Sequence, residues 1–331
     1  MRIGILGSGS WGTALAQVLS DNGNDVLVYG VVPSEIDDIN INHKNTAFFG
    51  DTLINDNIKA TLNLSEMADY NDIIVVAVPT KFIIGVLESV KPYVCRNTII
   101  VNVSKGFEQK TNKRISDCVR DTMAGISYKG LASLVGPSHA EEVILRKLTT
   151  VCAVSLDESV AREVQSVFSN NYLRVYITSD EIGAEYGVAI KNVIAIASGM
   201  LEGIGYGDNA KAALITRGLQ EMIRYGMSKG AKQNTFFGLT GVGDLIVTCF
   251  SPHSRNYQAG LEIGKANSAS VLANNSSTVE GVNSCKSVYE DAEKNGIEMP
   301  IVSAVYRVLF MGTNPSDEVA DIMSRPLKSE M

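Results

Sequence analysis

The sequence opens with the apolar run Ile3-Gly4-Ile5-Leu6, which leads at once into Gly7-Ser8-Gly9-Ser10-Trp11-Gly12. A stretch with helical character, residues 13–19, follows directly. A strand, a glycine-rich turn and a helix in this order form the dinucleotide-binding fingerprint. Gly7 allows the tight turn, Gly9 lets the backbone approach a pyrophosphate, and Gly12 lets the helix pack close to its strand. The helix N-terminus then presents free N–H groups to the phosphates, so this segment predicts a bound dinucleotide.

Apolar runs rich in valine and isoleucine alternate with helical patterns as far as residue 177. They lie at residues 25–29, 72–79, 98–103, 131–135, 149–154 and 173–177. Because these runs are continuous and do not alternate with polar residues, they indicate strands covered on both faces. We therefore expect an α/β unit with a doubly wound, Rossmann-like parallel sheet that binds its ligand at the carboxyl ends of the strands.

The pattern changes from Ser179 onward, where helical periodicity replaces the strand-like runs. Ser179 or Asp180 can cap a helix that runs toward Leu201. Further helices are expected near residues 210–229, 258–265, 281–295 and 301–310. The sequence thus predicts a dinucleotide-binding domain at residues 1–179 and an all-α substrate-binding domain at residues 180–331.

The composition of the 331 residues, 45% of them hydrophobic, is sufficient for two cores. A net charge of −7 argues against a nucleic-acid-binding surface, so any affinity for phosphate must come from a few placed cations. Five scattered cysteines without C-x-x-C spacing indicate reduced thiols in a cytoplasm. The three histidines form no helical i, i+4 pair, which argues against a histidine-based metal site.

The chain begins as a strand at Arg2, which leaves no room for a cleavable signal peptide. The longest apolar segment, residues 188–201, contains Lys191 and Asn192 and is short for a membrane span. We expect a cytoplasmic protein without membrane insertion. Apolar helix faces in the second half favour a homodimer.

Lys191 lies in the segment 186–196, which is apolar nearly all round as a helix. Burial of an ammonium there without a partner costs several kcal/mol, so its pKa should fall. A lysine with a lowered pKa can exchange a proton with the alcohol or ketone oxygen on which a nicotinamide enzyme acts. The alternative is that Lys191 extends along its own stem to solvent.

Two further segments follow predicted strands. Lys105 comes after the strand at 98–103, where ligands bind in this architecture, and Gly106 permits an unusual backbone turn. Gly136 and Ser138 precede a predicted helix whose N-terminus could hold an oxyanion. The alternatives are an ordinary surface lysine and a structural helix cap.

Asp244 follows two glycines, and Ser254-Arg255-Asn256 stands at another helix start. A hydroxyl, a planar cation and an amide donor together suit the multi-acceptor face of a phosphate. Taken singly, Asp244 could be a helix cap and Arg255 a solvated charge.

The ordered set of motifs GSGSWG, VAVP, NVSKG, GPSHAEEV, IKNVIAI, GVGDLIVTC, SRN and VEGV resembles the bacterial type of NAD(P)-dependent glycerol-3-phosphate dehydrogenase. The matches extend from residue 3 to about residue 310. The resemblance implies a Rossmann domain followed by a helical domain. It also implies conversion of dihydroxyacetone phosphate to sn-glycerol 3-phosphate for phospholipid synthesis, with NADPH or NADH as the cofactor.

By motif position, the resemblance makes Lys191 the general acid/base. It assigns the substrate to Lys105, Gly136, Ser138, Lys191, Asp244, Ser254, Arg255 and Asn256. It assigns the cofactor to Gly7, Gly9, Ser10, Trp11, Gly12, Lys105, Ala140, Arg255, Val279 and Glu280. Asp244 could orient either Lys191 or a substrate hydroxyl.

The choice between the two cofactors depends on the end of the second strand, where NAD enzymes often carry an acid and NADP enzymes an arginine. Residues 29–33 read Tyr-Gly-Val-Val-Pro and contain neither. The sequence therefore predicts no strong barrier to a 2′-phosphate and no dedicated site for one.

Two other functions compete with this interpretation. A two-domain reductase of β-hydroxy acids would also use a lysine, but it would not need the Ser254-Arg255-Asn256 cluster. A dinucleotide-sensing regulator would have no use for a lysine desolvated in an apolar helix.

Overall fold

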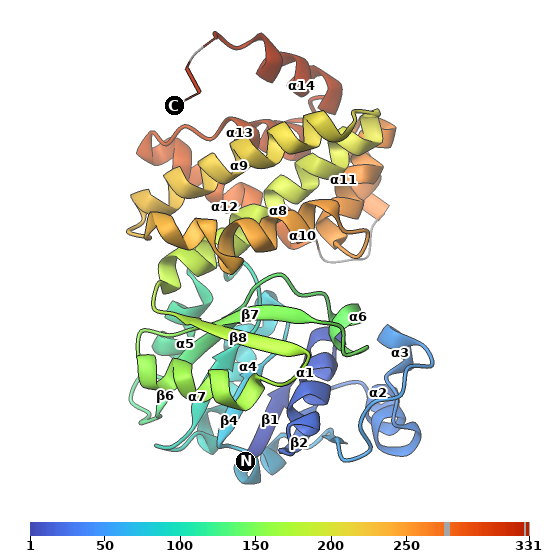
Figure 1. The fold of residues 1–331 in the computed structure, drawn as a ribbon, viewed down its shortest axis with the longest axis vertical. Coiled ribbons are helices and arrows are strands. Elements are labelled where there is room, and N and C mark those ends of the chain that lie inside the picture. Colours follow the sequence, from blue (N-terminus) through green and yellow to red (C-terminus); the bar gives the residue numbers. More distant parts are fainter. Residues whose placement is uncertain (275–278, 328, 331) are drawn as a thin grey trace. The chain divides into compact units, whose positions relative to one another are not determined.

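The computed structural model describes residues 1–274, 279–327 and 329–330. The chain divides into two compact units, Met1–Glu185 and Tyr186–Met331 (Figure 1). The sequence predicts a second domain from residue 180, whereas the compact units divide after residue 185. The first turn of the helix that begins at Glu181 belongs to the first unit, because Glu181 and Glu185 form ion pairs there.

The first unit is built on one eight-stranded sheet with the order β3-β2-β1-β4-β5-β6-β7-β8. The strands are β1 (Arg2–Leu6), β2 (Asp25–Tyr29), β3 (Lys59–Thr61), β4 (Ile73–Val76), β5 (Ile99–Asn102), β6 (Gly130–Val135), β7 (Thr149–Val154) and β8 (Leu173–Thr178). Neighbours are parallel except β6 and β7, so β7 and β8 run against the rest. The predicted doubly wound sheet is confirmed, with this reversal and the short strand β3 as additions.

The continuous apolar runs are explained by two separate cores, one on each face of the sheet. Ile3 and Ile5 of β1 pack into one core, and Leu6 packs into the other. The helices are α1 (Ser10–Asp21), α2 (Pro33–Asp37), α3 (Thr46–Phe49), α4 (Ile83–Val90), α5 (Ile115–Thr122), α6 (Ala140–Val143) and α7 (Glu158–Phe168). The first core includes residues of α1 and α7, and the second includes residues of α4 and α5. Because the central strands β1, β4 and β5 face apolar residues on both sides, their sequences have no polar face, whereas the edge strand β8 exposes Arg174 and Tyr176.

In the second unit, the described residues are helical wherever they form regular structure (Figure 1). The helices are α8 (Glu181–Ile204), α9 (Asp208–Ser228), α10 (Asp244–Phe250), α11 (Arg255–Ala266), α12 (Glu280–Asn295), α13 (Pro300–Tyr306) and α14 (Pro315–Ser324). Asp180 caps α8 as predicted, since its Oδ1 accepts from the N–H of Gly183 at 3.0 Å. The helix α14 was not predicted, and α10 was anticipated only in the alternative that Asp244 caps a helix.

Glycines allow α8 and α11 to touch through their backbones. A Cβ on Gly199 of α8 would collide with the carbonyl of Tyr257, and one on Gly260 of α11 would collide with that of Ile196. This contact buries the middle of α8 and fixes its rotation. By length and composition α8 could cross a membrane, but 83% of its apolar window is buried within the structure, as in a core helix.

Candidate functional site

The glycine-rich loop has the geometry that a pyrophosphate requires. Gly7 adopts φ +119°, and a Cβ there would come within 2.5 Å of the carbonyl oxygen of Ala77. A Cβ on Gly12 would collide with the carbonyl of Gly7. Packing therefore demands glycine at both positions. A Cβ on Gly9, by contrast, would meet no described atom within 4 Å, so the space beside this residue is open to a ligand.

No capping side chain occupies the N–H groups at the N-terminus of α1. Gly9 is the N-cap and has no capping side chain, and Ser10, Trp11 and Gly12 form the first turn without an acidic residue. The N–H groups of a first helical turn have no partner inside the helix, and the helix dipole adds positive potential there. The loop and helix thus fit the pyrophosphate of a dinucleotide.

Lys105 lies beside this loop. Its Nζ is 6.0 Å from the centre of the Trp11 ring. Gly106 adopts φ +99°, which confirms the predicted unusual turn. The Ser104 hydroxyl donates to the carbonyl of Val78 at 2.6 Å, which joins the loops after β4 and β5. The structure therefore brings Lys105 and the glycine-rich loop together at the carboxyl ends of β1, β4 and β5.

The segment after β6 differs from its predicted form. The Ser138 hydroxyl donates to the carbonyl of Gly136 at 3.1 Å, and His139 is the N-cap of α6 without a capping side-chain bond. The expectation that Ser138 caps a helix is wrong, because its hydroxyl stabilises the preceding turn. Ala140 begins α6, which has four residues, and is buried.

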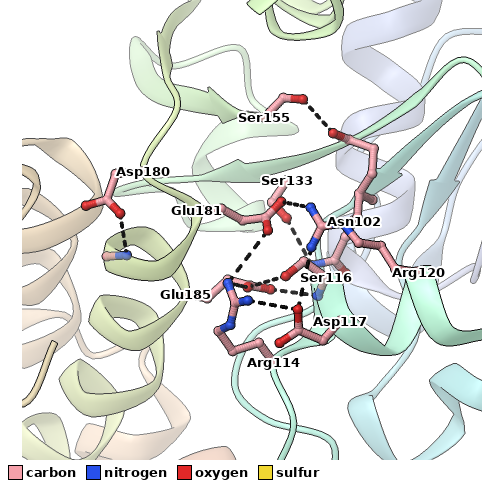
Figure 2. A network of polar contacts seen from close by, with 12 residues as sticks. Asn102, Arg114, Ser116, Asp117, Arg120, Ser133, Ser155, Asp180, Glu181 and Glu185 are labelled. Atoms are coloured by element: carbon pink, nitrogen blue, oxygen red, sulfur yellow. Dashed lines mark hydrogen bonds and ion pairs between the residues drawn. The ribbon is translucent and has the colours of Figure 1, made fainter. Parts of the chain in front are cut away.

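The start of α8 is fixed by a buried network of charges (Figure 2). Glu185 accepts from the N–H of Ser116 at 2.9 Å, from its hydroxyl at 2.6 Å and from Arg114 at 3.2 Å. Arg120 donates to Glu181 at 2.8 Å. Burial raises the pKa of Glu185 to about 7, against the opposing hydrogen bonds from Ser116. The sequence analysis did not predict this network, which sets where the helix that carries Lys191 begins.

Lys191 is a buried cation of the second unit, 2% exposed. Its Nζ lies 2.5 Å from Oδ2 of Asp244, a residue that is 1% exposed. The alternative that Lys191 reaches solvent is therefore wrong. The sequence argument assumed an ammonium without a partner, whereas a carboxylate stands directly against it and stabilises its charge.

Two neighbours of this ion pair were missed from the sequence. Lys191 donates to Oγ1 of Thr248 at 3.0 Å, and Thr248 donates to the carbonyl of Asp244 at 2.6 Å. Thr248 stands four residues after Asp244, so helical spacing could have identified it. The Nδ2 of Asn192 is buried and has no hydrogen-bond partner among the described residues. An orphaned buried donor of this kind needs an explanation, and a bound ligand supplies one.

The Ser254-Arg255-Asn256 segment meets the start of α12. Ser254 caps α11 by accepting from the N–H of Tyr257 at 3.2 Å. Asn256 Oδ1 accepts from the N–H of Gly281 at 2.8 Å. Arg255 has a 62% exposed side chain whose Nη2 lies 3.9 Å from Glu280, the residue that follows the N-cap Val279.

Gly281, at the start of α12, packs against α8 and α11, the helices that carry Lys191 and Arg255. A Cβ there would lie 2.7 Å from the carbonyl oxygen of Asn192 and 2.9 Å from Oδ1 of Asn256. Asn192 and Asn256, which follow Lys191 and Arg255 in sequence, therefore both meet the start of α12 at Gly281. Of the two groups, the buried acid–base pair can handle a proton and the exposed cation can handle an anion.

Comparison with known proteins agrees over the whole chain. The family models for the N-terminus and the C-terminus of NAD-dependent glycerol-3-phosphate dehydrogenase match residues 2–161 and 180–320. A glycerol-3-phosphate dehydrogenase [NAD(P)+] from Exiguobacterium sp. is 46% identical, with 100% of this chain and 97% of that protein covered. One from Staphylococcus epidermidis is 45% identical, with 99% of each covered. The crystal structure of glycerol-3-phosphate dehydrogenase from Coxiella burnetii matches with a TM-score of 0.90 and 32% identity, over 98% of each chain.

Proposed function

The chain belongs to the NAD-dependent glycerol-3-phosphate dehydrogenase family, and from this premise we propose which of its residues carry out the reaction. The enzyme transfers hydride between NAD(P)H and dihydroxyacetone phosphate, which gives sn-glycerol 3-phosphate. The product supplies the backbone of glycerophospholipids. The single observation that carries the assignment of roles is the buried Lys191–Asp244 pair.

Lys191 is the proton donor in this proposal. When bound, the nicotinamide cofactor supplies a hydride to the carbonyl carbon of the substrate. Negative charge then develops on the carbonyl oxygen, and the Lys191 ammonium stabilises that charge and donates a proton to it. The amine is left neutral and regains a proton from solvent. In the reverse direction, the neutral amine accepts the hydroxyl proton.

Asp244 and Thr248 keep the Lys191 amine in position. Asp244 Oδ2 holds the ammonium at 2.5 Å, and Thr248 accepts a second hydrogen bond from it at 3.0 Å. Of the two roles open to Asp244, this contact supports the orientation of Lys191. The orphaned Nδ2 of Asn192, on the next residue of α8, is suited to donate to a substrate oxygen.

The substrate phosphate is assigned to Arg255 and its neighbours. Arg255 offers a planar set of donors that matches a phosphate, and it is exposed enough to meet one. Ser254 and Asn256 hold the start of α11 in place through buried hydrogen bonds. Lys105, Gly136 and Ser138 complete the proposed substrate set.

The cofactor is assigned to the glycine-rich loop and to two later segments. Gly7, Gly9, Ser10, Trp11 and Gly12 hold the pyrophosphate. The remaining proposed contacts are Lys105, Ala140, Arg255, Val279 and Glu280. In this division of labour, residues 1–179 bind the dinucleotide and residues 180–331 bind the substrate.

The cellular setting is also a proposal. Free thiols, four of the five buried, support a reducing cytoplasm, and the net charge of −7 supports a partner list without nucleic acid. The burial of α8 within the second unit supports a chain that does not insert into a membrane. An apolar groove between α9, α13 and α14 supports a homodimer.

The role of Lys191 is tested by Lys191→Ala. We expect turnover of dihydroxyacetone phosphate to fall by about 10²- to 10⁴-fold, the usual contribution of a general acid. The affinity for NADH and NADPH, measured by fluorescence titration, should stay near that of the unmodified enzyme.

Lys286→Ala is the matched control, because Lys286 is an exposed lysine of the same unit and is weakly paired with Glu290 at 4.0 Å. It should leave turnover unchanged. Near-normal turnover of Lys191→Ala would remove Lys191 from the proton-transfer step.

A further inference from the structure

A carboxylate stands at the glycine-rich loop where residues 29–33 supply none. The chain leaves β2, enters α2, and brings Glu35 back toward the loop. The hydroxyl of Ser8, the second residue of that loop, donates to Oε2 of Glu35 at 2.5 Å. Ser8 is 5% exposed, so this bond is shielded from water on the Ser8 side.

Gly30 makes room for this contact. A Cβ at this position would collide with the Ser8 hydroxyl and would lie 2.9 Å from Cδ1 of Ile36. The end of β2, the glycine-rich loop and the first turns of α2 are therefore packed around the Ser8–Glu35 bond. Glu35 is held in one place and is not a freely moving surface acid.

The free oxygen of this carboxylate has the chemistry of a ribose acceptor. Ser8 occupies Oε2, and Oε1 accepts no hydrogen bond from any described residue. In dinucleotide-binding folds, an acid near the end of the second strand accepts from the ribose 2′-hydroxyl, whereas a 2′-phosphate needs an arginine. A 2′-phosphate offers no proton in place of that hydroxyl and carries negative charge instead.

The charges around Glu35 also disfavour a 2′-phosphate. A cavity of 420 Å³ is lined by Glu35, Asp37, Asp38 and Asn45, and no lysine or arginine lines it among the described residues. Asn45 donates to the carbonyl of Ser8 at 2.8 Å, which places the cavity against the glycine-rich loop. A hydrogen bond from the N–H of Thr46, followed by one from Asn42, lowers the pKa of Asp38 and keeps it charged at neutral pH.

We propose that Glu35, held by Ser8, makes this enzyme select NADH over NADPH. The proposal rests on the assignment of the cofactor to the glycine-rich loop. It names a specificity-determining residue, because Glu35 distinguishes the two cofactors and takes no part in hydride or proton transfer.

The test compares kcat/KM for NADH and for NADPH, with saturating dihydroxyacetone phosphate and at one ionic strength. The unmodified enzyme should favour NADH at least tenfold. Glu35→Gln should lower that ratio at least tenfold, by raising kcat/KM for NADPH and lowering it for NADH. Ser8→Ala, which frees the carboxylate, should lower the ratio by a smaller factor.

Asp37→Asn is the matched control, because it removes one negative charge from the same cavity without touching the Ser8 bond. Its ratio should change less than threefold. Because both cofactors are measured on each preparation, unfolded molecules lower both rates in the same proportion, and the ratio reports the cofactor preference of the folded molecules alone. Preference for NADPH in the unmodified enzyme, or an unchanged ratio in Glu35→Gln, would overturn the proposal.

The test of Glu35 and the test of Lys191 as proton donor can fail independently of each other. If Lys191 were not the proton donor, Lys191→Ala would retain turnover while the Glu35 ratio still responded as described. If the cofactor bound elsewhere, neither Glu35→Gln nor Ser8→Ala would change the ratio.

Discussion

Two buried groups of charges differ in how completely their members are paired. In the network at the start of α8, Glu185 alone takes two hydrogen bonds from Ser116 and one from Arg114. In the middle of the same helix, Lys191 closely contacts the carboxylate of Asp244, the first residue of α10. The oxygens of Asp244 make no well-directed hydrogen bond with any other described residue. Both carboxylates are nearly inaccessible to water.

The difference indicates what each group is for. A buried carboxylate whose two oxygens both accept hydrogen bonds has little left to offer a ligand, so we expect Glu185 to hold the structure. A buried pair with unfilled positions is a cost to folding, and such costs persist where a bound ligand uses the free positions. The first group should therefore govern stability, and the second should govern catalysis.

Removal of Arg114 from the network at the start of α8 should give the largest effect on stability. Arg114→Ala leaves Glu185 and Glu181 buried without this cation, so the free energy of unfolding should fall by about 3–5 kcal/mol. Urea unfolding followed by circular dichroism measures this loss. The molecules that remain folded should keep their kcat.

Lys113→Ala is the matched control for this variant. Its partner is Asp121 at 2.7 Å, and both side chains are more than half exposed, so the loss should be at most about 1 kcal/mol. Equal losses from Arg114→Ala and Lys113→Ala would show that the network at the start of α8 does not stabilise the fold.

The pH dependence of stability provides a second test of the same network. Burial raises the pKa of Glu185 from 4.5 to about 7 in the folded protein. A carboxyl group with a raised pKa stabilises the fold below its unfolded pKa, and that contribution is lost as the pH rises through the folded pKa. The free energy of unfolding should therefore fall by about 3 kcal/mol for this group between pH 4.5 and pH 7.5.

Glu185→Gln should remove this share of the pH dependence. Burial also raises the pKa of Glu221 to about 7, so Glu221→Gln should remove a second, separate share. Unfolding curves measured from pH 4.5 to pH 8 for the three proteins would check both. If Glu185→Gln had the same slope as the unmodified enzyme, Glu185 would be ionised throughout and the argument from burial would be wrong.

The sequence revealed elements whose pattern depends on their own residues. Strands buried on both faces appear as continuous apolar runs, and β2 and β7 were predicted at their observed bounds. The reversal of β7 and β8 was not visible, because a strand has the same pattern in either direction. The strand β3 was missed because its three residues, Lys59–Thr61, are too few to form a pattern.

The candidate site also has residues that the sequence could identify and residues that it could not. Lys191 could be identified because a charge in an apolar helix conflicts with its own neighbours. Its partner Asp244 was named with two possible roles, and the sequence could not decide between them. Thr248, 57 residues from Lys191, could be identified only through its helical spacing from Asp244. Arg114 could not be identified, because it is 71 residues from Glu185 and has the sequence character of a solvated charge. Glu35 was missed because it lies within α2 and not at the end of β2, where a cofactor-selecting acid is expected.

Arg255, an exposed arginine of the second unit, is the counterpart of Arg114 and should respond in the opposite way. Arg255 is 62% exposed and its contact with Glu280 is long, so Arg255→Ala should change the free energy of unfolding by less than about 0.5 kcal/mol. A hydrogen bond to a charged group contributes about 1.5–3 kcal/mol, so the KM for dihydroxyacetone phosphate should rise about 10- to 150-fold. Initial rates with unphosphorylated dihydroxyacetone, measured at saturating cofactor, should change far less, because that ketone has no phosphate to lose and excess cofactor offsets the loss of the proposed cofactor contact of Arg255. An unchanged KM for the phosphorylated ketone, or equal reactivity of the two ketones in the unmodified enzyme, would place the phosphate away from Arg255.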